Sequence, residues 1–146
     1  MPIITTEEKS FLFIHIPKTG GTTIEKTIMK SDNFKLYYRT SAGMPINKVT
    51  FCTPQHFQAD LLRQIFNLKK LSGIFTIVRN PYDRIKSEYA MRNKDIKNIK
   101  GHIVFHWLSK KIEIFKTTNP YVNDNHIRPQ HEFILPSIKI FKLEDG

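Results

Sequence analysis

The chain has 146 residues, of which 40% are apolar and 12% aromatic, so it can bury one hydrophobic core but is too short for two domains of ordinary size. Its net charge of +10 favours anionic partners, such as nucleotide phosphates, acidic glycans, nucleic acid or a membrane surface. The single cysteine, Cys52, excludes an internal disulfide. We expect one domain over residues 1–146.

The segment Met1–Ser10 is polar and acidic, and it lacks the basic stretch and apolar core of a signal peptide. No apolar run approaches the roughly 20 residues that cross a membrane. These two features predict a protein without a membrane span that stays in the cytoplasm.

The clearest pattern near the N-terminus is a strand followed by a glycine-containing loop and a helix. Phe11–Ile16 is an apolar run of strand length that ends at Pro17, and Gly20 and Gly21 then allow the backbone to turn with its N–H groups pointing inward. The helix that follows adds the positive end of its dipole, and Lys18 adds a fixed charge. A phosphate would fit this arrangement, although the same residues could also form only a turn and a helix cap. The candidate phosphate ligands are Lys18, Thr19, Gly20, Gly21, Thr22 and Thr23.

The next segments predict one short helix and one strand. Ile24 and Ile28 lie four residues apart, which gives a helix over Thr22–Lys30 one buried side and places Glu25 on another face. The composition of Phe34–Arg39 favours a strand.

A second strand, loop and helix are predicted in the middle of the chain. Lys48–Thr53 is rich in β-forming residues, and the apolar spacing over Phe57–Leu68 is typical of a helix. His56 would then lie in the loop after a strand, at the edge of an α/β sheet where ligands bind. A lone histidine near a helix start can also be a cap or a surface residue.

A third such unit carries a second candidate anion site. Gly73–Arg79 predicts a buried strand, and a helix over Pro81–Arg92 would begin with Asn80 as its cap. Ser87 follows Asn80 by seven residues, which is about two helical turns. Arg79 and Ser87 can therefore converge on one anion.

The C-terminal third predicts a helix over His102–Phe115, a polar loop over Asn119–Pro136 and a strand over Ser137–Leu143. His102 and His106 are four residues apart, but the glutamate of the HExxH zinc motif is absent. We predict no metal site.

Two motifs together resemble the cofactor signatures of sulfotransferases that use PAPS (3'-phosphoadenosine 5'-phosphosulfate), especially the carbohydrate and heparan sulfate 2-O and 6-O type. They are the P-K-T-G-G-T-T loop at residues 17–23 and the R-N-P-Y-D-R-I-K-S segment at residues 79–87, which fits an R-[DN]-P-x-x-R-x-x-S pattern. The resemblance implies that the loop and Lys18 bind the 5'-phosphate, that Arg79 and Ser87 bind the 3'-phosphate, and that no metal is needed.

The same resemblance implies a hydroxyl-bearing acceptor, expected to be a glycan, and a histidine base. His56 is the first candidate for that base and Glu25 the second. An H-x-R-P-Q-like segment, which recurs near the acceptor cleft of this family, implies contacts of acceptor or cofactor with His126, Arg128 and Gln130. Family members continue beyond the Leu-Glu-Asp at residues 143–145, so we expect either a minimal or a truncated member.

Two other functions are compatible with the same features. A nucleotide kinase of the P-loop class shares the strand, loop and helix, but the Walker order of glycines and lysine is absent. A basic module that binds polyanions fits the net charge, but no specific nucleic-acid motif occurs.

For the fold we predict an α/β, three-layer, P-loop-like domain with a short central parallel sheet flanked by helices on both faces. The expected strands are Phe11–Ile16, Lys48–Thr53, Ile74–Val78 and Ile138–Leu143.

Overall fold

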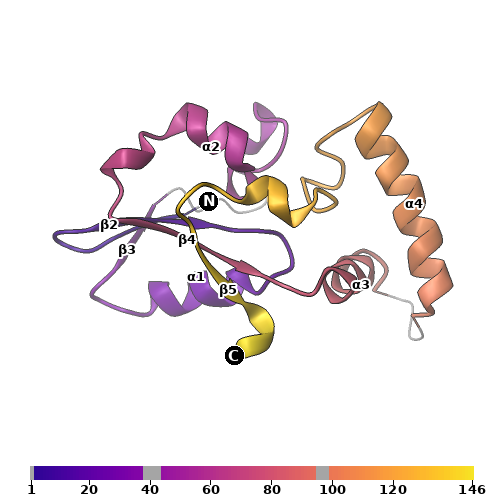
Figure 1. Ribbon diagram of the computed structural model, residues 1–146, viewed down its shortest axis with the longest axis horizontal. Helices are drawn as coiled ribbons and strands as arrows, with labels where there is room; N and C mark the ends of the chain where they lie inside the picture. The colour runs from indigo at the N-terminus through magenta and orange to yellow at the C-terminus, as the bar shows by residue number, and fades with distance from the viewer. Residues whose placement is uncertain (1, 38–43, 95–98) are drawn as a thin grey trace.

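The computed structural model describes residues 2–37, 44–94 and 99–146, and it contains a five-stranded mixed sheet (Figure 1). The strand order is β3-β1-β2-β4-β5. The strands span β1 Ile3–Thr5, β2 Ser10–Ile14, β3 Lys35–Tyr37, β4 Gly73–Val78 and β5 Lys139–Lys142. The chain is therefore a mixed α/β protein, as predicted.

Three of the predicted strands are confirmed, and they form the parallel part of the sheet. β2 pairs with β4 in the register Phe13 to Phe75, and β4 pairs with β5 in the register Ile77 to Phe141. Because these strands run the same way, their carboxyl ends meet at one edge of the sheet. The loops that follow them carry both predicted phosphate motifs.

Successive side chains of a strand point to opposite faces of the sheet, so the core is divided between the two faces. Leu12 and Ile14 of β2 belong to a cluster with Leu62 and Phe133, whereas Phe13 belongs to a second cluster on the opposite face. Helix α2 (Ala59–Ile65) covers the first face, and helix α1 (Gly21–Met29) covers the second (Figure 1). Helices thus flank both faces, as predicted.

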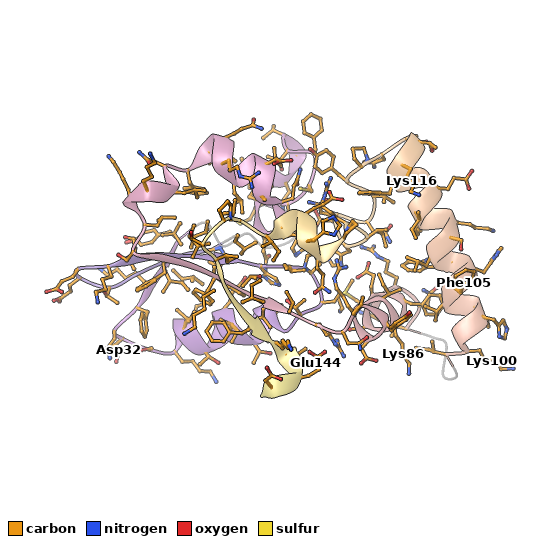
Figure 2. The ribbon with its side chains drawn as sticks, viewed as in Figure 1. Asp32, Lys86, Lys100, Phe105, Lys116 and Glu144 are labelled. Atoms are coloured by element: carbon orange, nitrogen blue, oxygen red, sulfur yellow. The ribbon has the colours of Figure 1, made fainter. Side chains whose placement is uncertain are left out.

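Helices α3 (Pro81–Arg92) and α4 (Gly101–Thr117) follow β4 and lie beside the end of the sheet (Figure 1). The bounds of α3 are those predicted from its Asn80 cap and Pro81. Helix α4 has no buried residue, and Figure 2 shows Phe105 and Lys116 along it, away from the sheet. No described helix is both long enough and apolar enough to cross a membrane.

The predicted strand at Lys48–Thr53 is wrong. A short 3-10 helix spans Pro45–Lys48 and bends follow it, with Val49 and Phe51 exposed at 78% and 83%. The amide of Thr53 donates to a side chain, Oδ1 of Asp124, at 2.6 Å instead of joining a ladder. Tertiary contacts have overridden the β-propensity of this segment.

The sheet is also mixed where a parallel one was predicted, because β1 and β3 pair antiparallel. β1 lies in the N-terminal segment described above only as polar and acidic, yet Ile3 and Ile4 are buried. The strand predicted at Phe34–Arg39 is confirmed as β3, although its last two residues lie outside the described ones.

Replacement of Asn80 by alanine should destabilise the fold by about 1 kcal/mol, because Oδ1 of Asn80 accepts a hydrogen bond from the amide of Tyr82 at 2.9 Å at the start of α3. Urea unfolding measures the change. Asn67→Ala is the control, because Asn67 begins a short 3-10 helix without a side-chain cap bond. Equal losses in both variants would contradict a capping role for Asn80.

Candidate active site

Three loops meet at the carboxyl edge of the parallel strands. The loop after β2 contains Gly20, and an added Cβ at that position would lie 3.1 Å from Cδ1 of Leu143, which follows β5. Glu144 accepts a hydrogen bond from the amide of Asn80, which follows β4, at 2.6 Å. Segments that are far apart in the sequence thus form one site.

The loop after β2 has the backbone of a strained turn. Lys18 and Gly20 have positive φ angles of 68° and 85°, and the first of these is uncommon for a residue with a side chain. Thr19 between them is buried, and its Oγ1 donates to the carbonyl of Ile16 at 2.8 Å. The side chain of Thr19 therefore stabilises the turn and is not exposed to solvent.

Helix α1 begins at Gly21 with Gly20 as its cap and without a side-chain cap bond. Thr22 and Thr23 in its first turn are exposed. The helix start can therefore offer amides, hydroxyls and its positive dipole end to an anion.

Lys18 and Arg79 lie close together beside this helix start. Nη1 of Arg79 donates to the carbonyl of Lys18 at 3.4 Å, and Nζ of Lys18 contacts Sδ of Met91 at 3.4 Å. Partial burial lowers the pKa of Lys18. The carboxylate of Glu88 opposes this shift, and the charges of Arg79 and Arg92 add to it. Ser87, the other predicted anion ligand, is half-buried on α3. The two predicted phosphate motifs are thus neighbours.

Arg84 is a site residue that the residue-by-residue analysis missed. Its Nε donates to the carbonyl of Pro17 at 2.9 Å, and its Nη2 donates to the carbonyl of His126 at 2.7 Å. Burial lowers the pKa of Arg84 to about 10, so it stays charged at neutral pH. Its signal was present, because Arg84 is the second arginine of the R-[DN]-P-x-x-R-x-x-S pattern.

His56, the predicted base, lies in a 3-10 helix at Pro54–His56 and is largely buried. Its Nδ1 lies 2.9 Å from Oδ2 of Asp124 and 3.1 Å from Oγ1 of Thr53. Burial lowers the pKa of His56, although the bond to Asp124 opposes this shift. A neutral imidazole at physiological pH can accept a proton.

Asp124 was not predicted as a site residue. It lies in a turn in which Asn123, Asp124 and Asn125 all have left-handed φ angles, of 57°, 59° and 66°. Asparagine and aspartate tolerate this conformation better than other residues with side chains, which explains the Asn-Asp-Asn sequence. Burial opposes ionisation of Asp124, but hydrogen bonds from His56 and Thr53 outweigh it and lower the pKa to about 2.

Two further histidines flank His56, and each is also paired with a carboxylate. The His126 ring lies 4.7 Å from that of His56, and its Nδ1 is 2.5 Å from Oε2 of Glu88 on α3. The ring of His15, the residue after β2, lies 5.4 Å from that of His56. His15 was missed, and its only signal was a polar residue within an apolar run.

Glu25, the second predicted base, is 1% exposed. Its Oε1 lies 2.6 Å from Nδ1 of His15 and accepts a hydrogen bond from Gln55 at 2.9 Å. Its side chain is therefore directed into the protein, where it orients His15 against Gly21. A direct role of Glu25 as the base stays a prediction.

Arg128 and Gln130, predicted to contact acceptor or cofactor, bond to the protein itself. Arg128 donates to Asn125 at 2.6 Å, to the carbonyl of Pro120 at 2.9 Å and to Glu132. Gln130 donates to the carbonyl of Arg79 at 2.8 Å and accepts from its amide at 3.0 Å. Both side chains thus hold the site together, and their contact with acceptor stays a prediction.

Among the described residues, one group has donor atoms close enough to hold a metal ion, namely His56, Asp124 and His126, with separations within 4.8 Å. Nδ1 of each histidine and both oxygens of Asp124 already take part in hydrogen bonds. His102 and His106 are exposed on α4. We assign no metal to this group.

Fold and site together define a mixed α/β domain that presents a lysine, the start of a helix and histidine–carboxylate pairs at one edge of its sheet. A protein-family model described as "Sulfotransferase family" matches residues 1–144. The chain belongs to the sulfotransferase family. Comparisons with curated proteins and with solved structures gave no match. Family membership supports a transferase that moves a sulfuryl group to a hydroxyl-bearing acceptor.

Replacement of Gly21 by alanine should destabilise the protein by about 1–3 kcal/mol, because the site is already filled by the His15 ring. An added Cβ would lie 2.5 Å from Nε2 of His15. Gly101→Ala is the matched control at the start of α4, where nothing lies within 4 Å of the added atom. Urea unfolding of both variants measures the difference, and a Gly21 variant as stable as the control would contradict the close packing.

Acidification should lower the free energy of unfolding. Burial lowers the pKa of His15 and of His56, so below about pH 6.5 the unfolded chain binds protons that the folded chain excludes. Asp124, with its pKa near 2, adds a further loss below about pH 4. Urea unfolding between about pH 7.5 and 5.5 tests the histidine contribution.

Raised ionic strength provides the control for this measurement, because protonation also increases a net charge that is already +10. The destabilisation that comes from the buried histidines should persist when salt screens that repulsion. A stability that is constant or rises as the pH falls would contradict the assignment of neutral histidines.

Proposed function

We propose that this protein is a sulfotransferase that uses PAPS as donor and transfers the sulfuryl group in line to a hydroxyl of a carbohydrate. The observation that carries the proposal is the hydrogen bond from Arg79 to the carbonyl of Lys18, which makes the two phosphate motifs neighbours at one sheet edge. We also propose that residues 1–146 act as one P-loop-like domain in the cytoplasm.

The residues at this edge fit a nucleotide with two phosphate groups. The amides of Thr19, Gly20, Gly21 and Thr22, the hydroxyls of Thr22 and Thr23 and the charge of Lys18 would hold the 5'-phosphate. The amide of Thr23 instead donates to the carbonyl of Gly20 at 2.9 Å. Arg79 and Ser87 would hold the 3'-phosphate, because a guanidinium binds a phosphate far better than it binds a ribose hydroxyl. This second contact would distinguish PAPS from ATP.

The chemistry requires an acid near the leaving oxygen and a base near the acceptor. As the acceptor oxygen bonds to sulfur, the bond from sulfur to the bridging oxygen breaks and its electron pair stays with the 5'-phosphate. Lys18 would stabilise the charge that grows on this oxygen. His56 would take the acceptor proton, because it is buried, neutral at physiological pH and placed beside the loop through its contact with His15.

The carbohydrate acceptor is supported by the resemblance to glycan sulfotransferases and by the basic net charge, which suits an acidic glycan. His126, Arg128 and Gln130 stay the proposed neighbours of acceptor or cofactor. The kinase alternative is less favoured, because the Walker order of glycines and lysine is absent from the loop. A polyanion-binding module would not need the buried base.

Adenosine 3',5'-bisphosphate should bind more tightly than adenosine 5'-monophosphate or Mg-ATP in calorimetric titrations. Arg79→Ala should weaken the bisphosphate about 10- to 100-fold, the size of one lost charge-assisted contact. The backbone bonds of residue 79 to Gln130 remain in this variant. Arg63→Ala on α2 is the control, because this exposed arginine pairs only locally with Asp60 among the described residues.

A bisphosphate preference that Arg79→Ala removes would support the cofactor assignment and justify an acceptor screen. His56→Gln should then keep bisphosphate binding and lose sulfuryl transfer. Equal binding of the monophosphate, or tighter binding of Mg-ATP, would overturn the PAPS assignment and favour the kinase. Binding that depends on salt but not on the 3'-phosphate would favour the polyanion module.

A further inference from the structure

We infer that Asp124, together with Thr53, fixes the tautomer of His56, so that Nδ1 carries the proton and Nε2 faces the acceptor as the base. Asp124 is thereby a positioning residue for the transfer. The inference rests on the proposed function for its catalytic meaning, but the tautomer itself can be measured without turnover.

The hydrogen atoms around His56 leave one consistent arrangement. Oγ1 of Thr53 lies 2.8 Å from Oδ2 of Asp124, and an ionised carboxylate can only accept, so the hydroxyl hydrogen of Thr53 points to Asp124. The oxygen of Thr53 can then only accept from Nδ1 of His56, 3.1 Å away. Oδ2 of Asp124, 2.9 Å from the same nitrogen, is also an acceptor. Nδ1 must therefore be the protonated nitrogen.

Three hydrogen bonds between side chains and the main chain hold this arrangement in place. The amide of Thr53 donates to Oδ1 of Asp124 at 2.6 Å, which locks the carboxylate plane. Nδ2 of Asn125 donates to the carbonyl of His56 at 2.8 Å, and this bond holds the main chain of His56 in place. Nη2 of Arg92 donates to the carbonyl of Asn123 at 3.0 Å and attaches the left-handed turn to α3. The turn thus connects the base to the helix that carries Ser87.

This geometry suits a base that must hold a proton only briefly. In a neutral imidazole with hydrogen on Nδ1, the lone pair is on Nε2, which can take the proton of the acceptor hydroxyl. The imidazolium that forms would keep its Nδ1–H directed at the Asp124 carboxylate and be stabilised by it. Besides Asp124, the titratable groups next to His56 among the described residues include the rings of His15 and His126 and the thiol of Cys52, whose Sγ lies 4.0 Å from the carbonyl of His56.

Asp124→Asn is a sharp test, because asparagine tolerates the left-handed backbone at this position. The amide of Thr53 still requires an oxygen at the place of Oδ1, so the amide NH₂ of the asparagine must take the place of Oδ2. There it donates to Nδ1 of His56, which must lose its hydrogen, and the proton moves to Nε2. The variant therefore reverses the tautomer without removing the histidine.

The experiment combines nitrogen-15 NMR of histidine-labelled protein with transfer kinetics. Wild type should show His56, assigned by comparison with His56→Gln, protonated at Nδ1 and bare at Nε2. Asp124→Asn should show the opposite tautomer, a kcat lower by about 10²–10⁴-fold, and little change in KM or in bisphosphate binding. Asp60→Asn is the charge-matched control on the exposed face of α2, where that side chain is 77% exposed, and it should change neither tautomer nor kcat.

Each outcome has one meaning. A wild-type His56 protonated at Nε2, or an Asp124→Asn variant that keeps both the tautomer and the kcat, would overturn the inference. The wild-type spectrum decides the tautomer even where the variant fails to fold. A wild type with a bare Nε2 and bisphosphate binding, but with no sulfuryl transfer to any acceptor, would support the tautomer and contradict the proposed reaction.

Discussion

The buried guanidinium of Arg84 holds together the segments that form the site. It bonds to the carbonyl of Pro17 in the loop after β2 and to the carbonyl of His126 in the segment that contains Asp124. A buried charge is tolerated only where its donors find acceptors, so both carbonyls must stay in place for α3 to pack. The position of the loop and the position of the histidines are therefore linked through one side chain of α3.

The three histidine–carboxylate pairs extend this linkage across the sheet edge. Glu25 comes from α1, Asp124 from the left-handed turn and Glu88 from α3, and each carboxylate lies at Nδ1 of its histidine. Carboxylates at Nδ1 favour the same tautomer in the rings of His56 and His126, whereas Nδ1 of His15 also lies 2.8 Å from Nε2 of Gln55. The cationic residues of the loop and α3 lie beside this buried cluster. One edge of the sheet thus combines cationic groups that can bind an anion with a histidine that can accept a proton.

Much of the fold could be predicted because its signals are local. The cap and proline at Asn80 and Pro81 determine where α3 begins, and the apolar runs identify β2 and β4. The strand β1 could not be predicted from a three-residue segment whose burial comes from its neighbours β2 and β3. The false strand at Lys48–Thr53 shows the same limit, because the amide of Thr53 bonds to a side chain 71 residues further along.

The site followed the same division between local and distant signals. Lys18 and Arg79 belong to short motifs and could be proposed from the sequence. His56 was proposed from the family resemblance and from its place after a predicted strand, and that strand is absent from the structure. Asp124 could not, because its pairing with His56 spans 68 residues and depends on the turn that surrounds it. Arg128 and Gln130 were recognised as part of a motif, but spacing could not show that their polar atoms bond to other groups of the protein, such as the side chain of Asn125 and the carbonyl of Arg79.

The left-handed backbone of Lys18 places an evolutionary constraint on the loop. A glycine would adopt its φ of 68° without strain, so lysine at this position sacrifices some folding stability to keep a charge beside the start of α1. Selection for folding stability alone would favour glycine or asparagine at this position. The persistence of lysine among descendants of this sequence would therefore report continued selection on chemistry, and its loss would mark lineages that retain the fold after the reaction has been abandoned.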